Sequence, residues 1–166
     1  ERTSDNFDYN YWSSPIGNAS TAIGNEPFGI TFLNRPTTLT ASTPAIALPY
    51  DYNLNGIANP LQIASRWVYR FITSSNYSQW IYAGNTNTIL PGEGFTMKGT
   101  SGSDNLDIEG NGVQNNPGGT GAQRYDFRGK PNDGNISVPI ALNNSTLTGN
   151  PYPSAIYADR FIADNA

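Results

Sequence analysis

The sequence contains no cysteine and no histidine. Without cysteine the chain forms no disulfide and has no thiolate, and without histidine it has no imidazole to act as a general acid or base. Zinc sites of the usual ligand types are excluded as well. These two absences remove many classes of enzyme, and they favour a function other than catalysis.

Charged residues are also scarce, at 13% of the chain, and they give a formal net charge of −4. A surface of that sign repels phosphate groups, so nucleic acid is not an expected partner. No apolar run reaches the roughly 20 residues that a membrane-spanning helix needs, so we expect no membrane span. Low charge with abundant asparagine, threonine, glycine and tyrosine suits an exported bacterial surface domain, and we expect an extracellular or cell-surface location.

The chain is rich instead in aromatic residues and turn formers, with 10 Tyr, 7 Phe, 3 Trp, 17 Gly and 12 Pro among its 166 residues. This length suits one hydrophobic core, so we expect a single domain over residues 1–166. Apolar residues alternate with a period of two, which is typical of strands. The expected strands are residues 7–12, 28–33, 66–72, 80–82 and 94–98.

The most specific local signal is the pair Asp133-Gly134, because Asp-Gly supplies the positive φ angles of a tight hairpin turn. We predict a hairpin here between strands at 125–128 and 136–140. Residues 99–121 predict a long loop with at most one short strand, at 106–108. Many short strands between Gly- and Pro-rich turns predict an all-β fold, a β-sandwich for which jelly-roll connections are one option.

One short helix is predicted at the C-terminal end, over residues 155–164. Ser154 is placed to cap its first turn. We expect Ile156, Phe161 and Ile162 to dock this helix on a sheet.

Four phrases run from near the start to near the end of the chain, at residues 9–15 (YNYWSSP), 92–99 (GEGFTMKG), 125–134 (YDFRGKPNDG) and 149–155 (GNPYPSA). In order and spacing they resemble a domain of large secreted and cell-surface proteins of Bacteroidota, commonly exported by the type IX system. The resemblance implies an extracellular β-rich module of a larger surface protein or adhesin, without a catalytic set. The family pattern continues past the last helix into another aromatic strand, so the resemblance also implies a processed or excised segment.

Aromatic side chains are the candidate binding residues, because Trp and Tyr rings stack on the apolar faces of sugars. The candidates are Trp80, Tyr82, Tyr77 and Trp12. Trp80, beside the polar residues 73–79, is the ring expected to be most exposed. For Trp12 and Trp67 a place in the core is the favoured alternative, since both stand in alternating strands.

Acidic residues of the Gly-rich loop are the candidate metal ligands. Asp104, Asp107 and Glu109 gather carboxylate oxygens on one flexible segment, as calcium sites do. The alternative is an acidic loop that is merely solvated, and no cofactor is otherwise expected. No pair of carboxylates stands out as a catalytic pair.

We therefore expect a non-catalytic structural or adhesive module of a bacterial surface protein, able to assemble with further copies into a fibre or surface layer. Its expected partners are other protein copies or cell-surface components. The alternative is a carbohydrate-binding module that stacks glycans on exposed Trp and Tyr rings.

Overall fold

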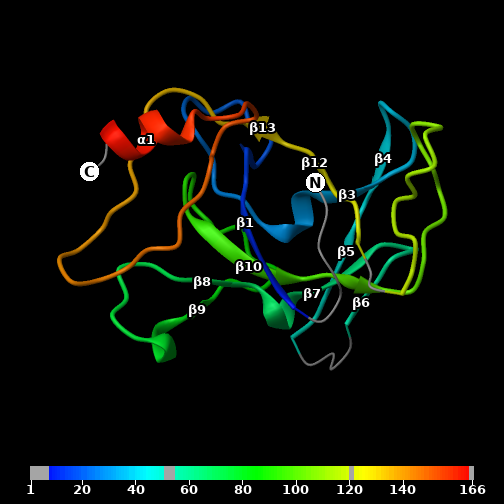
Figure 1. The fold of residues 1–166 in the computed structure, drawn as a ribbon, viewed down its shortest axis with the longest axis horizontal. Coiled ribbons are helices and arrows are strands. Elements are labelled where there is room, and N and C mark those ends of the chain that lie inside the picture. Colours follow the sequence, from blue (N-terminus) through cyan, green and yellow to red (C-terminus); the bar gives the residue numbers. More distant parts are fainter. Residues whose placement is uncertain (1–7, 51–54, 120–121, 165–166) are drawn as a thin grey trace.

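The computed structural model describes residues 8–50, 55–119 and 122–164 of the chain. Its largest sheet, which we call the main sheet, has the strand order β1-β10-β8-β9 and is antiparallel throughout (Figure 1). These strands are β1 (Tyr9–Ser13), β10 (Gly94–Lys98), β8 (Tyr69–Arg70) and β9 (Ile81–Tyr82). The two long strands pair along their full length, from Tyr9 opposite Lys98 to Ser13 opposite Gly94. Both were expected from their alternating residues.

Three smaller sheets complete the β structure. A four-stranded sheet has the order β11 (Thr100–Ser101), β6 (Gly56–Ile57), β7 (Gln62–Ala64) and β5 (Ile46–Leu48). A three-stranded sheet has the order β12 (Asp126–Phe127), β3 (Leu33–Pro36) and β4 (Ser42–Pro44), and β13 (Lys130–Pro131) pairs with β2 (Ile16–Gly17). The described residues also form three 3-10 turns, η1 (Ile30–Phe32), η2 (Ser65–Trp67) and η3 (Tyr77–Gln79). The prediction of an all-β fold with one short C-terminal helix is confirmed.

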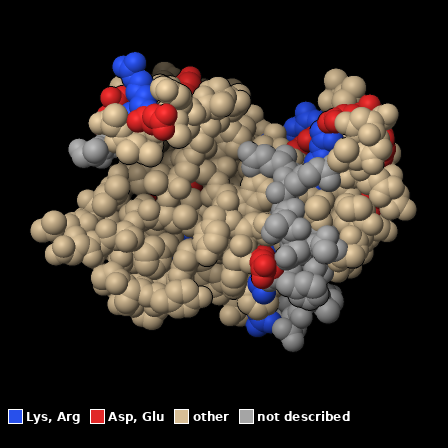
Figure 2. All heavy atoms as spheres, viewed as in Figure 1, with Lys and Arg blue, Asp and Glu red and all other residues tan. Residues whose placement is uncertain are grey.

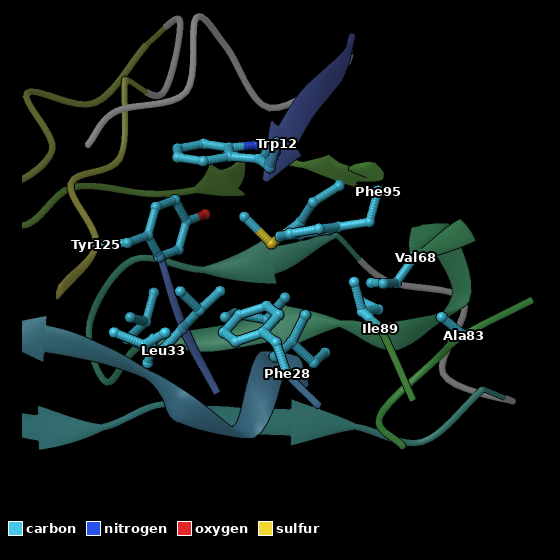
Figure 3. Close-up of a cluster of buried hydrophobic side chains, with 13 residues drawn as sticks. Trp12, Phe28, Leu33, Val68, Ala83, Ile89, Phe95 and Tyr125 are labelled. Atoms are coloured by element: carbon cyan, nitrogen blue, oxygen red, sulfur yellow. The ribbon is translucent and has the colours of Figure 1, made fainter. Parts of the chain in front are cut away.

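All four sheets contribute side chains to one hydrophobic core (Figure 3). Trp12 from β1 lies edge-on to Tyr125, with ring centroids 5.9 Å apart, and Phe95 from β10 packs against Phe28 at 5.3 Å. Aromatic pairs in these geometries stabilise a core beyond the area they bury. The main sheet therefore has one buried face and one face directed away from this core.

The segment 28–33 is not the strand that its apolar residues predicted. Phe28 makes only an isolated bridge with Ile89, and η1 follows at once, so that the strand β3 begins at Leu33, where the prediction had it end. Phe28, Ile30 and Leu33 are all buried, and a 3-10 turn can bury them together because it rotates the chain between strands. Expected segment 66–72 likewise begins as η2, and only Tyr69–Arg70 forms a strand.

The predicted hairpin at Asp133-Gly134 is wrong. Gly134 does adopt a positive φ of 66°, but the residues on either side pair elsewhere. β12 pairs with β3 and β13 with β2, while residues 136–140 form no strand. Asn25 clamps the turn instead, accepting a bond from the Asp133 N–H at 2.9 Å and donating one to its carbonyl at 2.8 Å.

The C-terminal part of the chain is mostly irregular. Residues 132–157 contain only two isolated bridges, Ser74–Ser145 and Glu93–Thr148, before the helix α1 (Ala158–Asp164). Figure 1 shows α1 at one end of the molecule and the Gly-rich loop at the other. The expected docking of α1 on a sheet is wrong, because Ile156, Phe161 and Ile162 are all exposed. In the described part of the chain, no helix has both the length and the apolar character to cross a membrane.

Candidate ligand-binding groove

Tyrosines cover the outer face of the main sheet because the strands alternate. Trp12 turns into the core, so Tyr9 and Tyr11 on the same strand point to the opposite face. β10 alternates in the same way, and its Thr96 and Lys98 stand opposite Tyr11 and Tyr9 in register. This outer face is where the aromatic groove described next is formed.

A rigid 3-10 turn forms the second wall of the groove. The side chain of Asn76 accepts a hydrogen bond from the backbone N–H of Ser78 in η3, and the side chain of Gln79 accepts one from the backbone N–H of Asn76 at 3.1 Å. This reciprocal capping holds the turn that carries Tyr77 and leads into Trp80. The Trp80 ring also packs on Phe71, with centroids 4.9 Å apart. The backbone of the turn and the Trp80 ring are therefore held in place before any ligand arrives.

Between these walls lies a groove of about 320 Å³, which we call the aromatic groove. It is lined by Tyr9, Tyr11, Tyr69, Tyr77, Ser78, Trp80 and Thr96. Tyr11 is 65% exposed and Tyr77 81% exposed, so the rings face solvent. Its size is near the lower end of ligand pockets, about 300–1,000 Å³. The groove suits a small or extended ligand with apolar faces.

The floor of the groove is fixed by Thr96. Its hydroxyl donates to the Trp67 carbonyl at 3.0 Å and accepts from the Tyr69 N–H at 3.2 Å. Burial raises the pKa of the Tyr9 and Tyr69 hydroxyls above the usual value, and the neighbouring tyrosines add to the rise. Both hydroxyls therefore stay neutral at neutral pH and can donate hydrogen bonds.

Two cations lie over aromatic rings at one end of this face. The Lys98 Nζ lies 4.2 Å from the centroid of the Trp67 ring and 5.0 Å from that of Tyr9. The Arg66 guanidinium lies 5.7 Å from the Trp67 centroid and 5.2 Å from that of Tyr50. Since Tyr9 also lines the groove, the positive charge of Lys98 adjoins it.

The predicted binding residues are divided between the groove and the core. Tyr77 and Trp80 both line the groove. Tyr82 lies on the same face, its ring 5.4 Å from that of Tyr69, but does not line the groove. Trp12 is only 7% exposed and belongs to the core, so it is out of reach of a ligand in the groove. Trp67, expected in the core, is half-buried on the outer face.

A family model described as a domain of unknown function (DUF8693) matches residues 38–166, more than half of the chain. The chain belongs to this family. Nothing among the curated proteins or the solved structures matches it. The matched part of this DUF8693 domain includes Tyr69, Tyr77, Trp80 and Thr96 of the groove, whereas β1 precedes it.

The acidic loop of the DUF8693 domain, residues 104–116, is organised around a buried ion pair between Arg35 and Asp104. Arg35 contacts the Asp104 carboxylate through two nitrogens, Nε at 2.6 Å and Nη2 at 2.7 Å. The Asn115 amide donates to the same carboxylate at 3.0 Å and to the Pro36 carbonyl at 2.9 Å. Asp104 and Asn116 also bridge the two ends of the loop through their backbones. This network ties the loop to β3.

The other two candidate metal ligands have protein partners as well. Backbone N–H groups of residues 109–112, Gly112 foremost, donate to Asp107 and hold its pKa below the usual range. Arg124 contacts the Glu109 carboxylate at 2.6 Å and lowers its pKa. Across the described ranges, no group of three His, Cys, Asp or Glu residues is arranged to hold a metal ion. The three acids are used to shape the loop.

Sequence reasoning missed several residues of this face: Tyr9, Tyr11, Tyr69, Thr96 and Lys98. A signal for the first two was present, because Tyr9 and Tyr11 share a face that Trp12 does not. Once Trp12 is assigned to the core, alternation alone directs the two tyrosines to solvent. Nothing comparable in the sequence predicts that Tyr9 and Tyr11 lie beside η3, because these segments are more than 60 residues apart along the chain.

Proposed function

We propose that this domain is a non-catalytic, extracellular adhesive module that binds glycans in the aromatic groove. The observation that carries the proposal is the lining itself, which presents five aromatic rings on a solvent-facing surface. Three of these rings, Tyr9, Tyr11 and Tyr77, are exposed, and a group of exposed rings marks a candidate binding surface because apolar area in water costs free energy. Sugar rings offer apolar C–H faces that cover such surfaces.

Polar groups in the groove complement the sugar hydroxyls. The neutral hydroxyls of Tyr9 and Tyr69 donate and accept, and the Ser78 side chain stands on the opposite wall. A few placed polar groups among apolar rings are the usual composition of a small-ligand site. The groove therefore supports recognition of a ligand that is apolar on its faces and polar at its edges.

Binding without hydrolysis is favoured by what lines the groove. Glycoside hydrolysis needs two carboxyl groups on either side of the scissile bond. None of the residues that line the groove is Asp or Glu, in the part of the chain that the structure describes. A carboxylate-free aromatic groove supports holding a sugar rather than cleaving it.

Glycan-array binding of the domain and three single variants tests the proposal. Tyr77→Ala and Trp80→Ala each remove a groove wall, and we expect each to weaken binding about tenfold, since one aromatic contact contributes up to about 1.5 kcal/mol. Tyr157→Ala is the matched control, because Tyr157 is another largely exposed ring, at 73%, and lies outside the groove. A blank array, or equal weakening by all three variants, would reject the groove.

Assembly with further copies of the chain is a second candidate, favoured by the C-terminal segment. Leu142 is 90% exposed, and Ile140, Ile162 and Phe161 are each at least half exposed. Charged side chains occupy only small groups on the face in Figure 2, so little repulsion opposes association. The double variant Leu142→Ser/Phe161→Ser should reduce the mass that light scattering measures at high concentration. A wild-type domain that stays monomeric at the highest soluble concentration would reject assembly.

A further inference from the structure

Lys98 is a cation without an acidic partner among the residues that the structure describes. It occupies the outer face of the main sheet, opposite Tyr9 in register. None of the described carboxylates lies within ion-pair distance of its ammonium group. All five ion pairs among the described residues belong to arginines, and Lys98 takes part in none of them.

Aromatic rings hold this ammonium group in place. It lies 4.2 Å from the Trp67 centroid and 5.0 Å from the Tyr9 centroid, within the distance of about 6 Å for a cation–π contact. The two rings meet edge to face, with centroids 6.1 Å apart. A lysine held by two rings loses less side-chain entropy on binding an anion than a free one does.

A second cation lies near Lys98, and the described residues that line the groove include no acid. Arg66 lies over the other side of the cluster, 5.7 Å from the Trp67 centroid. Burial raises the pKa of the Tyr9 and Tyr69 hydroxyls, so these two groups add no negative charge at neutral pH. No carboxylate is among the residues that line the groove in the described ranges. The groove is therefore lined by aromatic rings with a few hydroxyl groups, and the Lys98 cation lies at the end formed by Tyr9.

We propose that the aromatic groove selects acidic glycans of the uronic acid class, with the sugar carboxylate bound by the Lys98 ammonium. The sugar ring lies against Tyr9 and Tyr11, and its carboxylate points along β1 towards Lys98. A charge-assisted hydrogen bond between ammonium and carboxylate is stronger than a neutral one. This inference rests on the proposed function and adds the chemical class of the ligand to it.

Matched ligands and matched variants test the inference. Binding is measured by titration calorimetry with glucuronate- and galacturonate-terminated oligosaccharides, each beside its carboxyl-reduced counterpart, which keeps the same ring stereochemistry. The domain is compared with Lys98→Gln and with Arg160→Gln. The control variant removes the same charge from α1, where Arg160 is 77% exposed and lines no part of the groove.

The wild type should bind the uronates about tenfold more tightly than the reduced sugars, equivalent to about 1.4 kcal/mol. Lys98→Gln should remove this preference without weakening the neutral ligands, and Arg160→Gln should keep it. Equal binding of both ligand series by the wild type, or a preference that survives Lys98→Gln, would overturn the acidic class and leave the glycan groove intact. Failure of every sugar to bind would overturn the proposed function itself. Circular dichroism and thermal melting of each variant separate these results from unfolding.

Discussion

Replacing Arg35 with alanine should destabilise the domain far more than replacing an exposed arginine. The Asp104 side chain is only 2% exposed and that of Arg35 15%, so the substitution leaves a nearly buried carboxylate without its cation. Removing one partner of a buried pair typically costs roughly 3–5 kcal/mol. The Asn115 amide, at 3.0 Å, continues to donate to the carboxylate, so we expect a loss near the lower limit, about 3 kcal/mol.

Urea unfolding followed by fluorescence measures this loss. With a slope of about 2 kcal/mol per molar urea, a loss of about 3 kcal/mol lowers the unfolding midpoint by about 1.5 M. Arg128→Ala is the control, because its ion pair with Asp126 is exposed and contributes less than about 1 kcal/mol. Arg35→Lys should be intermediate, since it keeps the charge and loses the two-pronged contact. Equal losses for Arg35→Ala and Arg128→Ala would refute a buried ion pair as the anchor of the acidic loop.

Three further outcomes follow from the same structure. Because burial raises the folded-state pKa of Tyr9, Tyr69 and Tyr125, their contribution to stability is complete below the usual tyrosine pKa of 10.0, so urea midpoints should be constant from pH 7 to about 9 and fall above pH 10. A midpoint that rises above pH 10 would contradict this. Gly17→Ala should lower the free energy of unfolding by about 1–3 kcal/mol, because a Cβ there would lie 1.8 Å from the Glu26 carbonyl oxygen. An unchanged urea midpoint would show that the backbone relaxes. The melting temperature should be the same in excess calcium and in chelator, because the acids of the loop already have protein partners, whereas a rise with calcium would show that the loop binds the ion.

Sequence patterns predicted the main sheet well because its two long strands depend on alternation. In β10, Phe95 and Met97 enter the core while Thr96 and Lys98 face outwards, and pairing with β1 preserves this order. The burial of one face fixes the register, since a slip of one residue would exchange the faces. The sequence of such a strand alone therefore indicates which of its faces is buried.

The hairpin prediction failed because turn chemistry determines only local conformation. Gly134 adopts the positive φ that Asp-Gly favours, yet the strands beside it pair with β2 and β3 from more than 90 residues earlier. Asn25 supplies the bonds that hold the turn. Which strand a segment pairs with depends on tertiary contacts, and the two residues of a turn do not determine it.

Only one wall of the aromatic groove could be predicted from the sequence. Trp80 and Tyr77 stand in a polar segment, and their exposure could be expected from it. The opposite wall is built by β1, and only the pairing of β1 with β10 and of β10 with β8 brings the two walls together. The buried network of Asp104 and Arg35 was hidden as well, because a carboxylate in a Gly-rich loop is ordinarily solvated.

The indole N–H signals of the three tryptophans give the most direct test of the aromatic groove. Trp80 lines it, Trp67 lies beneath Lys98 at its end, and Trp12 lies in the core. In a nitrogen-15 correlation spectrum titrated with uronate oligosaccharide, the Trp80 and Trp67 signals should shift in a saturable way while the Trp12 signal stays in place. Saturable binding that leaves the Trp80 signal unmoved would contradict the account.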